Sequence, residues 1–328
     1  MPAPTAPNRT TATAPTSENT PKIVIFGSVN MDLSIETARM PQAGETLTGG
    51  GFITNPGGKG ANQAVACARL GAQTLLVGAV GADAFGRELT VGLEAAGVNC
   101  TQLMASEQAA TGVAVILRCE GDNRIILSPG ANHVLTGEQV AQALAQVAAP
   151  GDVFLTQGEC DFDATFAALH AARELGMFTA FNPAPAPTQP VPDAVWRDVD
   201  LVCLNETECS LLTGIAPDGD TGVARAAARL SELGVGIIVV TLGERGSMAW
   251  RDGSLTRVPA ERAEVVDTTA AGDTFIGALL SAHVAGLPLE HAMRRGSAAS
   301  ALAVTRLGAQ QSIPTLAEVR AHFKDSAL

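Results

Sequence analysis

Short apolar runs alternate with longer amphipathic segments along most of the chain. The runs at residues 22–28, 74–77, 153–156, 178–181, 200–204 and 236–241 are typical of buried strands. The segments at 61–70, 84–96, 163–175 and 222–233 have the length of helices, and Gly71 and Gly97 end the first two. Because apolar strands alternating with helices favour a parallel sheet covered on both faces, we expect a doubly wound, mainly parallel α/β fold flanked by helices.

Two segments interrupt this alternation. Residues 31–52 contain short extended pieces, and residues 112–127 predict two strands joined by the turn Glu120-Gly-Asp-Asn123. We expect a small β-sheet lid from about 31–55 and 111–128, although an ordinary edge hairpin fits the pattern equally well. The C-terminal third predicts helices at 272–286, 289–305 and 315–324. Residues 1–20 predict a disordered extension, which leaves 21–328 as one domain.

Composition narrows the classes of partner. The chain has 328 residues, a net charge of −12 and 46% hydrophobic residues. This acidic balance argues against nucleic acid, which binds basic patches, and neither a basic run nor a long apolar run indicates a membrane. The six cysteines form no CxxC pair, so we expect reduced thiols and a cytoplasmic protein.

The stretch from Val265 to Leu280 combines a strand-like start, a turn of small residues and an apolar helix. Free N–H groups and the dipole at a helix start favour an anion. The stretch therefore predicts an anion hole at Ala270, Ala271, Gly272 and Asp273. Asp273 is either a helix cap or the group that takes a proton from a hydroxyl attacking a bound phosphate.

Two other segments suggest how a polyhydroxyl ligand is held. The chain has neither a Walker A motif nor a G-x-G-x-x-G fingerprint, which disfavours an NAD-dependent oxidoreductase. Lys59 and Asn62 follow glycines at a helix start, where a flexible loop is the alternative interpretation. Asn30 and Asp32 follow the first strand and suit sugar hydroxyls, although such residues are often simple turn formers.

Two further turns suit a nucleotide. Asn205 and Glu208 have the spacing of a capping box, but they also suit Mg²⁺ that keeps its waters. The turn at 241–246 contains two glycines and Arg245, which suits phosphate and close backbone contact. Each motif is weak evidence for a nucleotide site when taken alone.

In this order, the segments resemble the ribokinase subgroup of the PfkB carbohydrate kinase family. The matching stretches are 27–32, 57–64, 182–186, 205–208, 241–246, 266–275 and 303–310. The resemblance covers residues 22 to about 315. It implies a ribokinase-like fold with a β lid, a homodimer paired through that lid, and phosphorylation of D-ribose by ATP to ribose 5-phosphate.

The resemblance also implies site residues by position. The sugar site would comprise Asn30, Asp32, Gly58, Lys59, Gly60, Ala61, Asn62, Glu159 and Asp273. The nucleotide site would comprise Asn205, Thr241, Leu242, Gly243, Glu244, Arg245, Gly246, Gly272, Asp273 and Ser297. Glu208 would serve Mg²⁺, and an activating K⁺ would lie at Asp267, Thr269, Ala303, Arg306, Gly308 and Ser312.

Three positions depart from the family pattern. Ser297 stands where a histidine often flanks adenine, Met31 replaces a small residue beside the sugar site, and Gly158 replaces a larger apolar residue. Alternatives that remain are a kinase of the same family acting on deoxyribose, fructose or a nucleoside, and a sugar-binding protein without activity. The second alternative is disfavoured because both Gly272 and Asp273 are present.

Overall fold

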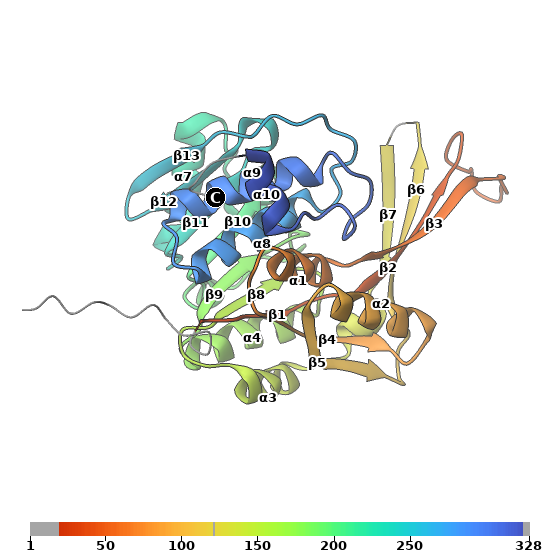
Figure 1. The fold of residues 1–328 in the computed structure, drawn as a ribbon, viewed down its shortest axis with the longest axis horizontal. Helices are drawn as coiled ribbons and strands as arrows, with labels where there is room; N and C mark the ends of the chain where they lie inside the picture. Colours follow the sequence, from red (N-terminus) through yellow and green to blue (C-terminus); the bar gives the residue numbers. More distant parts are fainter. Residues whose placement is uncertain (1–19, 121, 324–328) are drawn as a thin grey trace, which may run out of the picture.

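The main sheet of the computed structural model runs through the whole molecule (Figure 1). Within residues 20–120 and 122–323, which the structure describes, it has nine strands in the order β13-β12-β11-β10-β9-β8-β1-β4-β5. Its strands are β1 (Ile23–Phe26), β4 (Thr74–Gly81), β5 (Val98–Ser106), β8 (Val153–Gln157), β9 (Phe178–Asn182), β10 (Leu201–Asn205), β11 (Ile237–Thr241), β12 (Ser247–Arg251) and β13 (Ser254–Val258). Pairing is parallel from β5 to β11, and only β12 and β13 are antiparallel.

Helices cover both faces of this sheet because its strands are apolar on both sides. In β1, Ile23 and Ile25 join one core, whereas Val24 and Phe26 join the other. The first core lies under α1 (Lys59–Arg69), α2 (Ala84–Ala95), α8 (Ala271–Val284), α9 (Leu289–Ala303) and α10 (Leu316–Phe323). The second lies under α3 (Gly137–Val147), α4 (Phe162–Glu174), α5 (Asp193–Trp196), α6 (Glu206–Thr213) and α7 (Gly219–Glu232).

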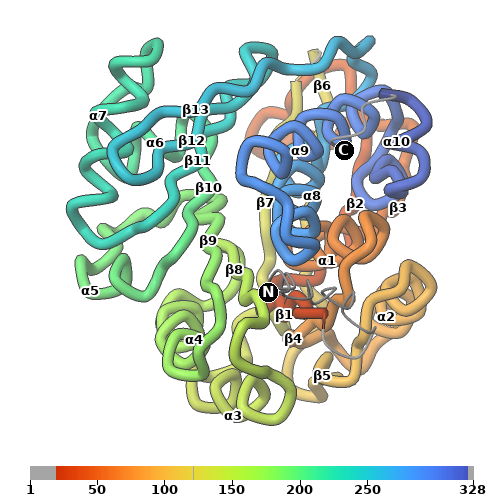
Figure 2. Tube along the Cα trace, turned by 60° about the vertical axis from the view of Figure 1, so that its left-hand side comes forward, coloured from red at the N-terminus to blue at the C-terminus, as the bar shows by residue number. Residues whose placement is uncertain are grey.

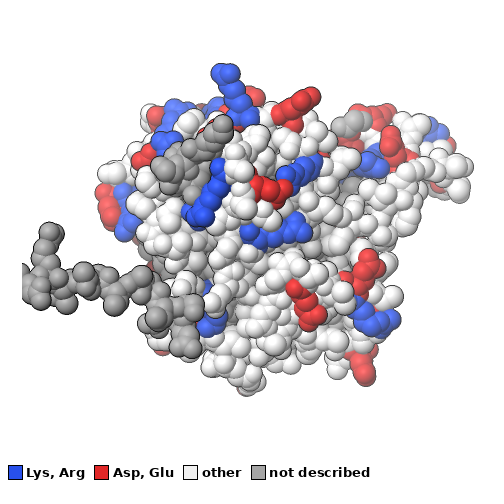
Figure 3. All heavy atoms as spheres, viewed as in Figure 1, with Lys and Arg blue, Asp and Glu red and all other residues white. Residues whose placement is uncertain are grey.

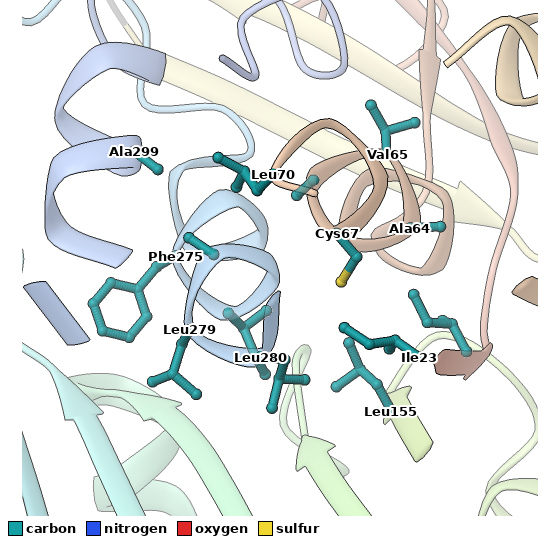
Figure 4. Packing of buried hydrophobic residues seen from close by; sticks show 14 of the residues in the cluster. Ile23, Ala64, Val65, Cys67, Leu70, Leu155, Phe275, Leu279, Leu280 and Ala299 are labelled. Carbon is teal, nitrogen blue, oxygen red and sulfur yellow. The ribbon is translucent and has the colours of Figure 1, made fainter. Parts of the chain in front are cut away.

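The packing of α1 against α8 matters most for the site, and Figure 2 shows the two helices side by side. Phe275, Leu279 and Leu280 of α8 are buried in the core, with Cys67 of α1 close by (Figure 4). A Cβ added at Gly277 would lie 2.4 Å from the Cβ of Ala66, so only glycine permits this approach. The close contact brings the first turns of the two helices together.

A second sheet projects from the main body (Figure 1). It contains β2 (Asn30–Glu36), β3 (Gly50–Gly57), β6 (Gly112–Cys119) and β7 (Asp122–Ser128), in the order β3-β2-β6-β7. Its pairs are antiparallel except β2 with β6, which is parallel. The predicted α/β fold with a small additional sheet is thus confirmed.

One expectation concerns residues that the structure does not describe, and several elements of the fold were not predicted. The expectation for residues 1–20 lies outside the described residues, apart from Thr20. The strands β5, β12 and β13 and the helix α3 were not predicted. No helix in 20–120 or 122–323 is long and apolar enough to cross a membrane.

Candidate active site

The candidate site lies where the order of the main strands reverses. The chain proceeds from β1 outward to β4 and β5, then returns to β8 on the other side of β1. Ligands of open α/β sheets bind beyond the carboxyl ends of the strands at such a point. Asn30 and Glu159 follow β1 and β8 there, and Asn205 and Thr241 end β10 and β11.

The carboxylate of Glu159 joins three segments on one side of the site. Its Oε2 accepts hydrogen bonds from Ser28 Oγ at 2.6 Å, from the Lys59 backbone N–H at 3.0 Å and from Asn30 Nδ2 at 3.4 Å. Asn132, in the short turn after β7, donates to Asn30 Oδ1 at 2.7 Å and so fixes the Asn30 amide. The polar groups expected at the sugar site are therefore held in place by the protein.

The start of α1 requires glycine. Gly58 has φ 89°, and a Cβ there would lie 2.7 Å from the Asn30 backbone nitrogen. The N–H groups of Gly60 and Ala61 donate to Ser28, to Oγ at 3.3 Å and to the carbonyl at 2.9 Å. These two groups are thus used to dock α1 on the end of β1, leaving the side chains of Lys59 and Asn62 for the site.

Asp32 extends the site onto the second sheet. Burial raises its pKa to about 7, and the nearby carboxylates of Glu159 and Asp273 act in the same direction. Met31 alternates with Asp32 along β2 and is fully buried in the core. Its side chain therefore lies on the face of β2 opposite to that of Asp32, because successive strand residues point to opposite faces.

Gly158 also has a packing explanation. A Cβ at this position would lie 2.5 Å from the carbonyl oxygen of Pro185. A larger side chain would push this loop away, so the departure from the family pattern accommodates the 184–186 segment.

Asp273 is buried in the first turn of α8 and is held from α1. Its Oδ2 accepts from Asn62 Nδ2 at 3.0 Å, and its Oδ1 accepts from Gln63 Nε2 at 2.9 Å. With one hydrogen bond on each oxygen, the carboxylate keeps further lone pairs for a hydroxyl. It is accordingly placed to orient a hydroxyl and accept its proton.

The turn before α8 presents backbone donors at the start of a helix. Ala270 adopts a left-handed conformation with φ 59° and its carbonyl accepts from the N–H of Thr274 at 2.8 Å. The N–H of Ala271 donates to Thr268, whereas in the described residues the N–H groups of Gly272 and Asp273 have no acceptor. Two free donors at a helix start attract a phosphate oxygen.

A cavity of about 210 Å³ lies in front of this turn. Its lining includes many of the predicted residues, drawn from α1, β10, α6, β11 and the turn before α8. The full lining is Lys59, Asn182, Ala184, Cys203, Leu204, Asn205, Glu208, Thr241, Thr268, Ala270, Ala271, Gly272 and Asp273. The predicted catalytic, anion-binding and magnesium residues thus share one cavity.

Lys59 supplies positive charge to this acidic cavity. Burial alone lowers the pKa of its ammonium group, but the charges of Asp273, Glu159 and Glu208 outweigh burial and raise it. The side chain therefore stays protonated and is suited to a transferred phosphoryl group.

Asn205 and Glu208 form the predicted capping box. Asn205 Oδ1 accepts from the Glu208 N–H at 2.8 Å, and Glu208 Oε2 accepts from the Asn205 N–H at 2.9 Å. Burial raises the pKa of Glu208, which lines the cavity. The residues consequently cap α6 and also face the cavity, so the two interpretations are compatible.

The predicted nucleotide residues beyond Thr241 lie less directly at the cavity. Leu242 is buried in the second core, and Gly243, Glu244 and Arg245 form a short 3₁₀ turn closed by the bond from Leu242 N–H to the Gly246 carbonyl. Arg245 pairs with Glu206 of α6. None of these four is in the cavity lining.

Ser297 lies on α9 and is also outside that lining. Its hydroxyl donates to the Pro259 carbonyl at 3.1 Å and accepts from the Glu261 N–H at 3.2 Å. It thereby fixes the segment that leaves β13.

The predicted potassium residues come from two loops joined by Asp267. Its Oδ1 accepts from the N–H and hydroxyl of Thr269 at 2.9 and 2.6 Å, and its Oδ2 accepts from the Gly308 N–H at 3.0 Å. Burial raises the pKa of Asp267, but these donors outweigh it and the net pKa lies below its usual value. The carboxylate therefore acts as a tie between the loops.

The second of these loops has its own internal bonds. The Ala303 carbonyl accepts from the Arg306 N–H at 3.0 Å, and the Arg306 side chain pairs with Glu318 at 2.8 Å. Ser312 is fully buried and its hydroxyl donates to the Ala309 carbonyl at 2.7 Å.

Sequence reasoning missed several polar residues of this site. Ser28, Gln63 and Asn132 each make a hydrogen bond with a predicted site residue. Ser28 and Gln63 lie inside the two glycine-containing motifs, so their closeness in sequence to predicted site residues was the one available signal. Asn132 carries no signal because it reaches the site from a turn 102 residues away from Asn30.

Comparison with known proteins identifies the family. The pfkB family of carbohydrate kinases matches residues 20–316. The ribokinase of Haemophilus influenzae is 36% identical over 90% of this chain and 96% of its own length, and the deoxyribokinase of Salmonella typhimurium is 34% identical over 90% and 96%. The structure of Arabidopsis thaliana ribokinase complexed with ribose and ATP is similar with a TM-score of 0.85 at 32% identity, covering 93% of this chain and 99% of the other. The chain therefore belongs to the pfkB family of carbohydrate kinases.

Proposed function

We propose that this protein transfers the terminal phosphoryl group of ATP to the 5-hydroxyl of D-ribose. The observation that carries this proposal is the buried Asp273 carboxylate beside the free N–H groups at the start of α8. One group orients an alcohol and the other attracts the phosphate that the alcohol attacks. The similarity to ribokinases over nine-tenths of the chain supports ribose as the acceptor.

The two substrates approach from different sides. Asn30, Asp32, Lys59, Asn62 and Glu159 offer carboxylates, amides and an ammonium group, which suit the hydroxyls of a sugar. The cavity between α6, β11 and the turn before α8 takes the nucleotide, so that its terminal phosphate meets the N–H groups of Gly272 and Asp273.

The chemistry follows from the properties of these groups. A carboxylate is too weak a base to deprotonate a sugar hydroxyl in advance, but phosphoryl transfer has a loose transition state and the proton can leave late. Asp273 therefore orients the attacking oxygen and accepts its proton as the new bond forms. The N–H groups and Lys59 stabilise charge that develops on the phosphoryl oxygens.

We propose that Mg²⁺ enters with ATP. The described residues contain no group of three or more His, Cys, Asp or Glu side chains suited to holding a metal. This fits Mg²⁺, which keeps several waters and is commonly bound by phosphates with one or two carboxylates. Glu208 would hold it through water, and the ion would offset the negative charge of ATP.

We propose that K⁺ activates the enzyme at the loops tied by Asp267. The family resemblance implies mostly backbone carbonyl ligands from these loops, which suit this ion, and the first loop leads within a few residues to Ala270. A bound ion there would hold the anion-binding turn in the conformation in which its N–H groups point towards the phosphate. Its role is structural, and the transfer itself uses other groups.

We propose that the second sheet is a lid and that two copies pair through it. Apolar side chains are exposed on three of its strands: Phe52, Ile53, Val115, Ile125, Ile126 and Leu127. Uncharged residues form much of the visible surface of this sheet (Figure 3). Such a patch on a projecting sheet favours burial against a second copy.

A coupled assay of ADP release tests the proposed reaction. At fixed ATP and Mg²⁺, D-ribose is expected to give the highest kcat/KM, above 2-deoxyribose, fructose and a nucleoside, and NMR of the product should place the phosphate on the 5-oxygen. Higher kcat/KM with 2-deoxyribose would instead assign a deoxyribokinase. Ribose binding by calorimetry without ADP release would refute catalysis.

A further inference from the structure

We propose that Gln63 is a positioning residue for catalysis, which fixes the orientation and ionisation of the Asp273 carboxylate. This inference rests on the proposed function, in which Asp273 receives the proton of the sugar hydroxyl. Gln63 is fully buried in α1, and its Nε2 donates to Asp273 Oδ1 at 2.9 Å. The same nitrogen donates its other hydrogen to Asn182 Oδ1 at 2.9 Å.

A backbone carbonyl determines the direction of this chain of hydrogen bonds. Asn182 Nδ2 donates to the Cys203 carbonyl at 2.9 Å, and a carbonyl can only accept. Asn182 must therefore present its oxygen to Gln63, which in turn must present its nitrogen. Rotating the Gln63 amide would place an oxygen against both Asn182 Oδ1 and the Asp273 carboxylate, so this alternative is excluded.

The arrangement makes Gln63 a rigid donor. Both hydrogens of its Nε2 are used, and the chain ends on the backbone of β10, a strand buried in the main sheet. Its Oε1 is buried without a hydrogen-bond partner in the described part of the chain, so the side chain is oriented by its nitrogen alone. Polar groups that are expensive to bury are often retained at functional sites.

Gln63 differs in role from its neighbour Asn62. Asn62 keeps a small exposed fraction of 6%, so a ligand can share its amide. Gln63 is enclosed and has no access to a ligand, so it acts only through Asp273. A hydrogen-bond donor to a carboxylate favours its ionised form and restricts its rotation. Asp273 needs both effects, because it must be ionised and must point one oxygen at the sugar hydroxyl to accept the proton.

The test compares two substitutions with opposite effects on this donor. Gln63→Met keeps the size of the side chain and removes the hydrogen bond. Because bonds to charged groups are strong, kcat is expected to fall about 10- to 100-fold, while KM for ribose and ATP changes less than about 3-fold. The acid limb of the pH–kcat profile should move up by about one pH unit, since the ionised carboxylate has lost a donor.

Gln63→Glu gives the complementary result. At low pH the introduced carboxyl group is protonated and can still donate to Asp273, whereas at high pH two carboxylates repel each other. Its activity should therefore be closest to that of the natural protein on the acid side and fall on the alkaline side. Merely structural damage would lower kcat equally across the pH range.

Thr165→Val is the matched control. Thr165 is fully buried in α4, which packs on the opposite face of the sheet from α1 and α8, and its hydroxyl donates to the Asp161 carbonyl at 2.7 Å. This variant should lose thermal stability but keep kcat and its pH profile. If both Gln63 variants are insoluble, Asn182→Leu, which removes the anchor but leaves the donor, should show a smaller fall in kcat with a smaller acid-limb shift in the same direction.

Two outcomes overturn the inference. One is a folded Gln63→Met protein with normal kcat, and the other is a lowered kcat with an unshifted pH profile. The natural protein is assayed in parallel, and a failure of that protein to phosphorylate ribose would refute the proposed function instead.

Discussion

Replacing Asp32 by asparagine should stabilise the unliganded protein at neutral and alkaline pH. The Asp32 carboxyl has a pKa of about 7 in the folded protein because burial and two other carboxylates oppose its ionisation. In the unfolded chain it titrates near its ordinary value of 3.8. Between these two values the folded state binds a proton that the unfolded state does not, so the free energy of unfolding falls as the pH rises.

The size of the effect follows from the pKa difference. About three pKa units correspond to about 4 kcal/mol at most, since each unit is worth about 1.4 kcal/mol. Asp32 is only partly buried, and water and local relaxation reduce this figure, so we expect a gain of about 1–3 kcal/mol at pH 8 for Asp32→Asn. The gain should become small towards pH 4 and vanish below that pH, where the natural carboxyl is protonated in both states.

Urea unfolding at several pH values between 4.5 and 8 measures this directly. The difference in unfolding free energy between the variant and the natural protein should grow with pH across this range. Ribose affinity should change in the opposite sense, because an asparagine cannot replace a carboxylate as an acceptor for two hydroxyls. A constant difference in stability from acid to alkaline pH would refute the assignment of the raised pKa to Asp32.

Three further predictions concern the turn before α8, the loops tied by Asp267 and the second sheet. Asp273→Asn should lower kcat about 10²–10⁴-fold with little change in ribose affinity, and near-normal turnover would remove Asp273 as the proton acceptor. K⁺ should raise the rate above that in Na⁺ at equal ionic strength, and Asp267→Ala should abolish the difference; equal rates in both salts would count against the cation site. Ile126→Asp should shift the protein from dimer to monomer in sedimentation, whereas Val91→Asp, at an equally exposed position on α2, should not; a monomeric natural protein would contradict pairing through the second sheet.

The sequence predicted the features that depend on local signals. Alternating apolar runs identified most parallel strands, and the turn leading into α8 identified Asp273 from neighbouring residues alone. The hairpin of β12 and β13 was missed although Asp252-Gly253 between its strands is a strong turn signal. The edge strand β5 is mostly exposed or half-buried and so lacks the continuous apolar run used to find the others.

Features that depend on tertiary contacts were not predictable. Gln63 and Asp273 are 210 residues apart, and their contact exists because glycine at position 277 lets α1 and α8 approach. The side-chain direction of Met31 became clear only once β2 was known to run from Asn30, which placed Met31 on the core face. A motif names the residues at a site, but helix packing determines which of them touch.

Strand β2 begins in the proposed sugar site and ends at the far side of the projecting sheet. Asn30 lies at its first position and Glu36 at its last, with hydrogen-bonded neighbours along both edges. Such a continuous strand would transmit a tilt at one end to the other, so binding of the proposed acceptor and movement of the sheet would be coupled. A molecule bound at the Glu36 end of the strand would then change the sugar affinity at the Asn30 end without contacting the sugar.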